Sequence, residues 1–170
     1  SINLHCKDSG NREKDKTKPK NMQQLNLPPY SVRLQETSGK RTIFDVLRRK
    51  YVVLTPEEWV RQHFVHFLIE HKHYAASLMA NEVELRIGEK RLRCDSVLYD
   101  TRLHPRMIIE YKAPHIALTQ KVFDQISAYN MLMKVDYLMV SNGLQHYCCK
   151  MDYARQQYLF LEEIPDYSAL

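Results

Sequence analysis

Residues 91–112 of the chain, RLRCDSVLYDTRLHPRMIIEYK, decide the fold because they predict two β-strands joined by a turn. Segments 91–99 and 106–112 alternate or run apolar, and segment 100–105 between them contains the Asp and Pro residues of a break. If the turn is centred between Arg102 and Leu103, residues whose numbers sum to 205 face each other. This register makes Asp95 and Glu110 direct cross-strand neighbours.

Asp95, Glu110 and the nearby Lys112 form a candidate metal site. The Cβ atoms of cross-strand neighbours lie about 4.5 to 5.5 Å apart, and Lys112, two residues beyond Glu110, projects from the same face. Two like charges repel there, but a bound cation would remove the repulsion. Carboxylate oxygens suit Mg²⁺, and the backbone carbonyl of Tyr111 is a further candidate ligand. The alternative is an exposed Asp and Glu-Lys pair, but the apolar segment 108–111 favours a buried strand.

The segments around this hairpin predict an α/β domain with a mixed sheet. Further strands are indicated at 82–88, 135–141, 145–150 and 157–162, and a helix at 118–133. Because a strand-helix-strand unit crosses over in the right-handed sense, segment 135–141 should run parallel to segment 106–112.

The region before the sheet predicts a hairpin and a helix. Segments 31–36 and 41–46 are strand-like and are separated by a turn signal. Thr55-Pro56-Glu57-Glu58 then supplies a capping Thr, a Pro at the first helical position and the Glu of a capping box. The helix should run to about Lys72, with one apolar face made by Trp59, Val60, Phe64, Phe67 and Leu68.

Length and charge indicate one domain with a weakly basic balance. The chain has 170 residues and a formal charge of +5. Residues 1–21 hold six basic and three acidic side chains, so they contribute +3 and read as a mobile arm or remnant before a domain at 22–170. The four cysteines lack metal-ligand spacing, and no apolar stretch has membrane length, so we expect a cytoplasmic protein.

Several motifs together resemble a known family. Cys94-Asp95, followed by Glu110-Tyr111-Lys112-Ala113-Pro114, is similar to the PD-(D/E)XK nuclease signature. More narrowly, the chain from Met22 onward resembles the N-terminal nuclease domain of type I restriction enzyme R subunits. The motifs that carry this resemblance are residues 55–62, the strand of Glu82, Asp124-Gln125 with Tyr129-Asn130, and Ser141-Asn142-Gly143.

The resemblance implies a restriction-endonuclease-like mixed β-sheet flanked by helices, with an N-terminal β-hairpin. It implies a Mg²⁺- or Mn²⁺-dependent DNA endonuclease that hydrolyses phosphodiester bonds, with restriction-modification subunits or a separately encoded motor as partners. The implied metal ligands are Asp95, Glu110, Tyr111 and Glu82. The implied catalytic residues are Asp95, Glu110, Lys112, Gln125 and Tyr129. The implied DNA contacts are Arg91, Arg93 and Lys121.

Two rival hypotheses remain. The chain could be a non-catalytic DNA-binding or scaffold module that kept the fold and acts with a partner. More remotely, it could be an enzyme that uses Cys94 beside Asp95 as a nucleophile. His63 and His66 share a helix face but lack further zinc ligands nearby, which favours a solvated face. Cys148-Cys149 should send one side chain inward and one outward.

Overall fold

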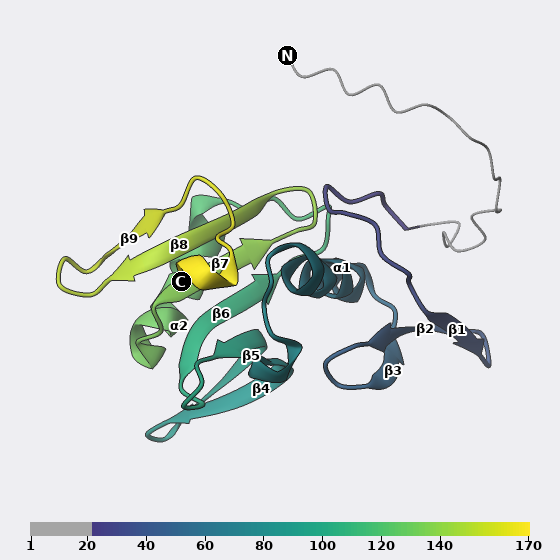
Figure 1. Ribbon diagram of the computed structural model, residues 1–170, viewed down its shortest axis with the longest axis horizontal. Helices are drawn as coiled ribbons and strands as arrows, with labels where there is room; N and C mark the ends of the chain where they lie inside the picture. The colour runs from purple at the N-terminus through teal and green to yellow at the C-terminus, as the bar shows by residue number, and fades with distance from the viewer. Residues whose placement is uncertain (1–21) are drawn as a thin grey trace, which may run out of the picture.

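Two β-sheets and two α-helices make up residues 22–170, the part of the chain that the computed structural model describes (Figure 1). The predicted arm at 1–21 lies outside the described residues, as do the side chains of residues 128, 129 and 132. In chain order the elements are β1 (Leu34–Thr37), β2 (Lys40–Asp45), β3 (Lys50–Val53), α1 (Pro56–His71), the short 3-10 helix η1 (Ala76–Leu78), β4 (Met79–Ile87), β5 (Lys90–Tyr99), β6 (Pro105–Tyr111), α2 (Gln120–Met133), β7 (Tyr137–Ser141), β8 (His146–Asp152), β9 (Gln157–Phe160) and a second 3-10 helix, η2 (Tyr167–Ala169). No helix within 22–170 is long and apolar enough to span a bilayer.

The larger sheet has six strands in the order β4-β5-β6-β7-β8-β9. β6 and β7 run parallel and all other neighbours antiparallel, so the sheet is mixed, as predicted. The parallel pair follows from α2, because two parallel strands need a crossover between them. Met107 pairs with Tyr137, and Tyr111 pairs with Ser141. The predicted parallel arrangement of the two segments is therefore confirmed.

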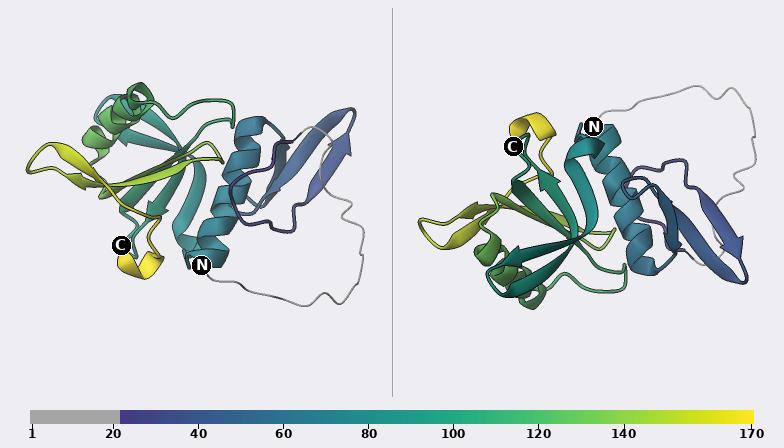
Figure 2. Two further views of the ribbon diagram at one scale, coloured as in Figure 1. Left: turned by 90° about the horizontal axis from the view of Figure 1, so that it is seen from above. Right: turned by 90° about the horizontal axis from the view of Figure 1, so that it is seen from below.

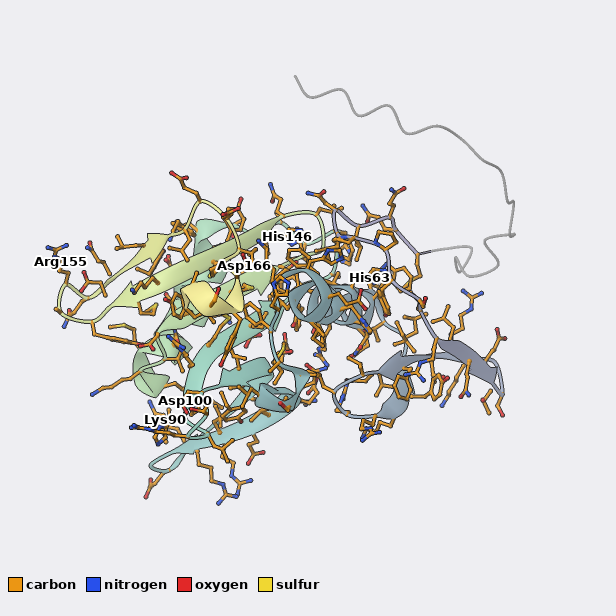
Figure 3. All side chains as sticks on the ribbon, in the orientation of Figure 1. His63, Lys90, Asp100, His146, Arg155 and Asp166 are labelled. Carbon is orange, nitrogen blue, oxygen red and sulfur yellow. The ribbon has the colours of Figure 1, made fainter. Side chains whose placement is uncertain are left out.

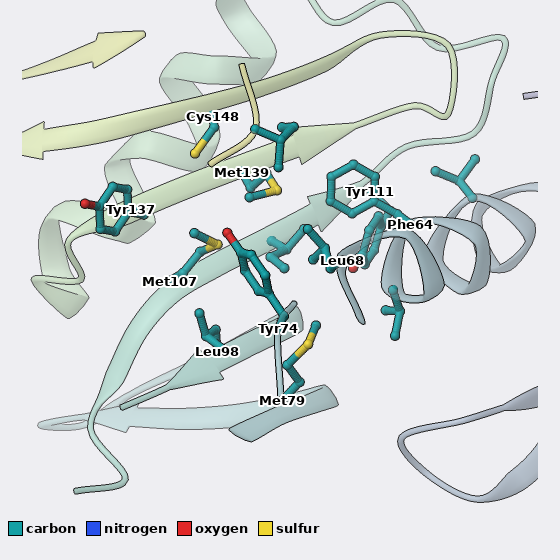
Figure 4. Packing of buried hydrophobic residues seen from close by; sticks show 14 of the residues in the cluster. Phe64, Leu68, Tyr74, Met79, Leu98, Met107, Tyr111, Tyr137, Met139 and Cys148 are labelled. Atoms are coloured by element: carbon teal, nitrogen blue, oxygen red, sulfur yellow. The ribbon is translucent and has the colours of Figure 1, made fainter. Parts of the chain in front are cut away.

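A helix covers each face of the six-stranded sheet (Figure 1). On one face Phe64 and Leu68 of α1 pack with Tyr111 and other residues of the sheet (Figure 4). On the other face Phe123 and Ile126 of α2 pack in a second cluster. Strands covered on both faces read as continuous apolar runs, which explains the sequence of β7.

The two adjacent cysteines of β8 point to opposite faces, as expected. Cys148 belongs to the cluster under α1 and Cys149 to the cluster under α2. The expectation that one thiol is exposed is wrong, since their residues are 2% and 0% exposed. Alternation along a strand exposes a side chain only where one face of the sheet is bare.

The smaller sheet, in the order β1-β2-β3, packs on the side of α1 that faces away from the six-stranded sheet (Figure 2). Its predicted hairpin is confirmed, with a tighter turn than expected. Ser38 and Gly39 have φ angles of 51° and 72°, as in a two-residue hairpin loop. Pattern reasoning misses β3, although its run Tyr51-Val52-Val53 consists of strand-forming residues.

Asp45 at the end of β2 connects the smaller sheet to the rest of the domain. Its fully buried carboxylate accepts the backbone N–H groups of Leu47 and Arg48 at 2.9 Å and the side-chain amide of Asn81 at 3.0 Å. Burial alone would raise the pKa of Asp45, but these hydrogen bonds and the Arg48 guanidinium lower it below the usual value. The Arg48 guanidinium also forms an ion pair with Glu58 on α1, with 3.2 Å between Nη2 and Oε1.

The start of α1 follows the predicted cap in one half only. Thr55 Oγ1 accepts the backbone N–H of Glu58 at 3.0 Å, as expected. The reciprocal contact of the predicted capping box is wrong, because the Glu58 carboxylate accepts hydrogen bonds from other side chains. These donors are Arg48, Arg61 and Gln62.

The solvated histidine face expected on α1 is wrong for His63, which Figure 3 labels on this helix. His63 is 8% exposed, and its Nδ1–H donates to the carbonyl of Trp59 at 2.8 Å. The Tyr30 ring packs edge-on against it, with 4.8 Å between centroids. Burial lowers the pKa of His63, so the imidazole stays neutral at neutral pH.

The segment 22–30 bridges α1 and the β7–β8 turn. The Asn26 N–H donates to the Gly143 carbonyl at 2.8 Å, and His146 Nε2–H donates to the Asn26 carbonyl at 2.9 Å. A Cβ atom on Gly143 would lie 2.7 Å from Leu25, and its φ of 84° also favours glycine. The turn is therefore shaped to accept this segment.

Candidate functional site

The ladder between β5 and β6 ends one step before the two predicted metal ligands. Ser96 pairs with Ile109, and the numbers of this pair sum to the predicted 205. Asp95 and Glu110 occupy the next positions outward, where the Tyr111 backbone N–H donates to Asp95 Oδ2 at 2.9 Å. Glu110 is also close enough to Asp95 for the negative charge of Asp95 to raise its pKa. The structure thus brings both carboxylates together where the ladder stops.

The surroundings of Asp95 and Glu110 disfavour ionisation of both carboxyl groups. Burial raises the pKa of Glu110 well above its usual range, and the negative charge of Asp95 raises it further. The positive charge of Lys112 opposes part of this shift. Two ionised carboxylates therefore cost free energy at this position, and a cation between them would recover it.

A cleft of about 260 Å³ opens beside Glu110. Five of the predicted site residues line it, together with two apolar side chains: Arg91, Leu92, Arg93, Glu110, Lys112, Gln125 and Ile126. Gln125 comes from α2, so the crossover helix delivers its polar side chain to the end of the β5–β6 pair. The role of Gln125 at this position stays a prediction.

Asp95 and Glu82 do not line the cleft, and three further predicted site residues lie apart from it or beyond the description. Lys121 is exposed near the start of α2 and does not line the cleft. Tyr129 lies on α2, but its side chain is outside the described residues. The Tyr111 side chain is buried on the α1 side, with its hydroxyl 3.0 Å from Ser96 Oγ, so only its backbone could reach a cation.

Arg61 of α1 supplies a buried positive charge behind the site. Its side chain is 3% exposed, and Nη2 lies 2.7 Å from Glu82 Oε1 and 3.3 Å from Asp95 Oδ1. Its Nη1 donates to Glu58 Oε2 at 3.0 Å. Sequence reasoning misses Arg61, although an arginine among the buried positions of an amphipathic helix is a signal for a charge partner elsewhere.

Glu57, in the first turn of α1, is the second residue that sequence reasoning misses. Burial raises the pKa of its carboxyl group, and the charge of Asp95 raises it further, while Lys112 and Arg61 lower it. Glu57 therefore lies in the electric field of the same site. Two consecutive acidic residues at the helix start were a signal, because a cap explains only one of them.

Glu82, the predicted additional acidic ligand, is held by two arginines. Its Oε1 contacts Arg61, and its Oε2 accepts from Arg93 Nε at 2.7 Å. Its φ of 55° interrupts the β4–β5 ladder between Asn81 and Val83. Within residues 22–170 no three His, Cys, Asp or Glu side chains are grouped to hold a metal ion. A metal role for Glu82 would require it to exchange its arginine partners.

The geometry disfavours Cys94 as a nucleophile. Its residue is 3% exposed, and burial raises the pKa of its thiol to about 12, with further contributions from Glu110 and Asp95. A nucleophilic cysteine needs an accessible thiolate. The thiol of Cys94 has neither property.

Residues 56–165 match the family model described as type I restriction enzyme R protein N terminus (HSDR_N). The matched region begins at α1 and includes both helices, the six-stranded sheet and the cleft, but not the smaller sheet. A search of curated proteins finds no match to the chain. Because the match covers more than half of the 170 residues, the chain belongs to the family of type I restriction enzyme R protein N-terminal domains.

Proposed function

We propose that the chain is a metal-dependent DNA endonuclease domain of the PD-(D/E)XK type that hydrolyses phosphodiester bonds. Asp95 and Glu110 would hold Mg²⁺ or Mn²⁺, with the Tyr111 carbonyl as a further ligand. The observation that carries the proposal is the convergence of the two carboxylates at the open end of the β5–β6 ladder, beside Lys112. Membership of a restriction enzyme family supports the same reading.

The residues fit a hard divalent cation. Carboxylate and carbonyl oxygens are the ligands that Mg²⁺ prefers, and few protein ligands leave room for water and phosphate. The pKa of Glu110 is raised mainly by burial and next by the charge of Asp95, and a bound cation would offset both effects. When bound, such a cation would stabilise negative charge on the phosphoryl group and increase the acidity of a water molecule.

The side chains of the cleft would bind and orient the substrate. Lys112 would donate hydrogen bonds to the attacking water or to a phosphate oxygen and stabilise the developing negative charge. Gln125 would orient the same phosphate through its amide, and we retain Tyr129 as its helical partner. Arg91 and Arg93 would contact flanking phosphates, with Lys121 further along the DNA, and Glu82 would limit the reach of Arg93 until DNA competes for it.

The test is cleavage of supercoiled plasmid DNA by the full chain with Mg²⁺ or Mn²⁺. Lys112→Ala should abolish cleavage while its thermal unfolding curve stays close to that of the wild type. Lys150→Ala, which removes an exposed lysine from β8, is the matched control and should cleave normally. Wild-type protein that cleaves no single-stranded, duplex or branched DNA with either metal would contradict the proposal.

A second candidate is a non-catalytic nucleic-acid-binding or scaffold module that acts with restriction-modification subunits or a separate motor. The ion pair between Arg61 and Asp95 favours it, because it neutralises the aspartate without a metal. In that case DNA binding would be independent of EDTA and unchanged by Asp95→Asn, and cleavage would be absent.

A further inference from the structure

The smaller sheet has two chemically different faces. Its ladders pair Leu34 with Ile43 and Ile43 with Val52, so these three side chains share one face with Asp45. Successive residues of a strand point to opposite faces. The opposite face, here called the outer face, therefore carries Arg33, Gln35, Thr37, Lys40, Thr42, Phe44, Tyr51 and Val53.

The inner face of this sheet is already occupied. Ile43 and Asp45 are fully buried, and Ile43 belongs to the cluster that contains α1. Both acidic residues of the described segment before α1, Glu36 and Asp45, have inner-face positions. The outer face as the structure describes it thus has cationic, hydroxyl, amide and apolar groups but no carboxylate.

Two aromatic rings and one guanidinium group are in contact on the outer face. The Phe44 and Tyr51 rings contact edge to face, with 5.3 Å between centroids. The Arg33 guanidinium carbon lies 3.5 Å from the Phe44 centroid and forms a planar cationic layer over that ring. Tyr51 is 36% exposed and Val53 61% exposed. Both side chains therefore present apolar surface to solvent.

The net charge also differs between the segment of the smaller sheet and the rest of the described chain. Residues 22–55 hold six basic and two acidic side chains, a net charge of +4. Residues 56–170 hold thirteen basic and fifteen acidic side chains, a net charge of −2. The excess of positive charge in the described chain therefore lies in the segment of the smaller sheet, where it favours a polyanionic partner.

Not every cation of this region is available to a ligand. Arg48 is committed to Asp45 and Glu58 inside the domain. Arg33 and Lys40 remain on the outer face, and Arg49 and Lys50 are exposed at the β2–β3 turn beside it. The basic cluster at 48–50 is therefore split between a structural role and the surface.

We propose that the outer face of the smaller sheet binds single-stranded nucleic acid. Unpaired bases stack on aromatic rings and on guanidinium planes, while cations follow the phosphate backbone. Tyr51 and the Arg33–Phe44 layer provide the stacking surfaces, and Lys40 contacts phosphate. A duplex keeps its base faces stacked inside, so the exposed rings favour an unpaired strand. This inference extends the proposed nuclease function by assigning it a strand-holding surface outside the cleft.

The test is fluorescence anisotropy of a labelled oligothymidine of about 15 nucleotides, a length suited to one small binding surface. The full chain is used in EDTA, so that binding is measured without cleavage. Tyr51→Ser should weaken binding about tenfold, since stacking of one base is lost. Lys40→Glu should weaken it about tenfold and reduce the slope of log affinity against log salt by ~1 to 2.

Two matched controls carry the same chemical changes on the other sheet. Phe160→Ser removes an aromatic side chain that is 50% exposed on β9, and Lys150→Glu reverses an exposed charge on β8. Both should bind as the wild type does. Thermal unfolding of all four variants checks that these substitutions have not altered the fold.

The outcomes separate this proposal from the nuclease proposal. Binding that depends on Tyr51 and Lys40, without metal-dependent cleavage, keeps the strand-binding surface and rejects the nuclease. Metal-dependent cleavage with Tyr51→Ser and Lys40→Glu binding as the wild type keeps the nuclease and rejects the surface. Tighter binding of a duplex of the same length than of the single strand would also overturn the proposal.

Discussion

The Arg61 guanidinium on α1 lies 3.3 Å from the Asp95 carboxylate on β5, and it simultaneously contacts Glu58 and Glu82. One buried cation thus fixes the position of a predicted metal ligand from behind. Without Arg61, these three largely buried carboxylates would lose their shared counter-charge.

Arg61→Met should reduce the free energy of unfolding by about 3 to 5 kcal/mol, the usual cost of removing one partner from a buried charge network. Urea unfolding followed by circular dichroism measures the change. Arg155→Met is a control, because the Arg155 side chain is 75% exposed. A loss of less than about 1 kcal/mol for Arg61→Met would match a surface ion pair and refute the buried role.

Glu110→Gln should increase stability in EDTA by about 1 kcal/mol, because it removes a buried carboxyl group whose raised pKa disfavours the folded state at neutral pH. Mg²⁺ should then stabilise the wild type but not the variant. Thermal unfolding with and without the metal measures both effects. Equal metal responses would show that Glu110 is not a ligand.

The stability difference between Glu110→Gln and the wild type in EDTA should depend on pH, because the pKa of Glu110 is raised in the folded state. Above the unfolded pKa of about 4.3, the folded state retains a proton that the unfolded state has lost, so the wild type loses stability as pH rises towards the folded pKa. The variant lacks this group. Its advantage in EDTA should therefore grow from pH 4.5 to pH 7 and vanish near pH 4.

Asp45→Ala should destabilise the domain by about 3 kcal/mol, because it leaves Arg48 and Asn81 without their buried acceptor. The lowered pKa of Asp45 means that its contribution is complete above the unfolded value of 3.8 and is lost as pH falls through the folded pKa. Urea unfolding at pH 7 and below pH 4 measures both parts. Glu36→Ala, an exposed change in the same sheet, should have little effect.

His63→Phe should flatten the acid side of the stability profile. Burial lowers the pKa of His63, so the unfolded state binds a proton below pH 6.5 that the folded state refuses. The wild type should therefore lose stability as pH falls from 6.5 to 5.5, by up to about 1.4 kcal/mol per pH unit. His71→Phe, at an exposed position, is the control. Identical slopes for the wild type and His63→Phe would contradict the burial argument.

Local pattern was sufficient for the register of the β5–β6 pair. Alternation and one turn predict that numbers sum to 205, and the ladder keeps this sum from Ser96–Ile109 to Leu98–Met107. The bulge at Leu98/Tyr99 shifts the pairing only on the turn side. The ladder ends at Ser96–Ile109, one step before Asp95 and Glu110, so their direct cross-strand pairing stays a prediction.

Pattern was insufficient wherever a side chain depends on a distant partner. His63 looked solvated because Tyr30, which covers it, is distant in sequence and has no periodic relation to α1. Glu82 looked free to bind metal because its partners Arg61 and Arg93 come from two other elements. Glu58 differs, because two of its donors, Arg61 and Gln62, lie on the same helix and only Arg48 comes from another part of the chain. Such pairings follow from packing, which a single sequence does not encode in its spacing.

The bridge from Asn26 to Gly143 and His146 bears on how shorter versions of this protein would behave. Recombinant fragments are often trimmed to the limits of a matched family, which here start at residue 56. Such a fragment would lose the covering of His63 by Tyr30, the Arg48 partner of Glu58, the Asp45 acceptor of Asn81 and the contact of Leu25 with Gly143 in a single cut. The smallest piece that folds by itself should therefore begin at or before residue 22, well ahead of the first matched position.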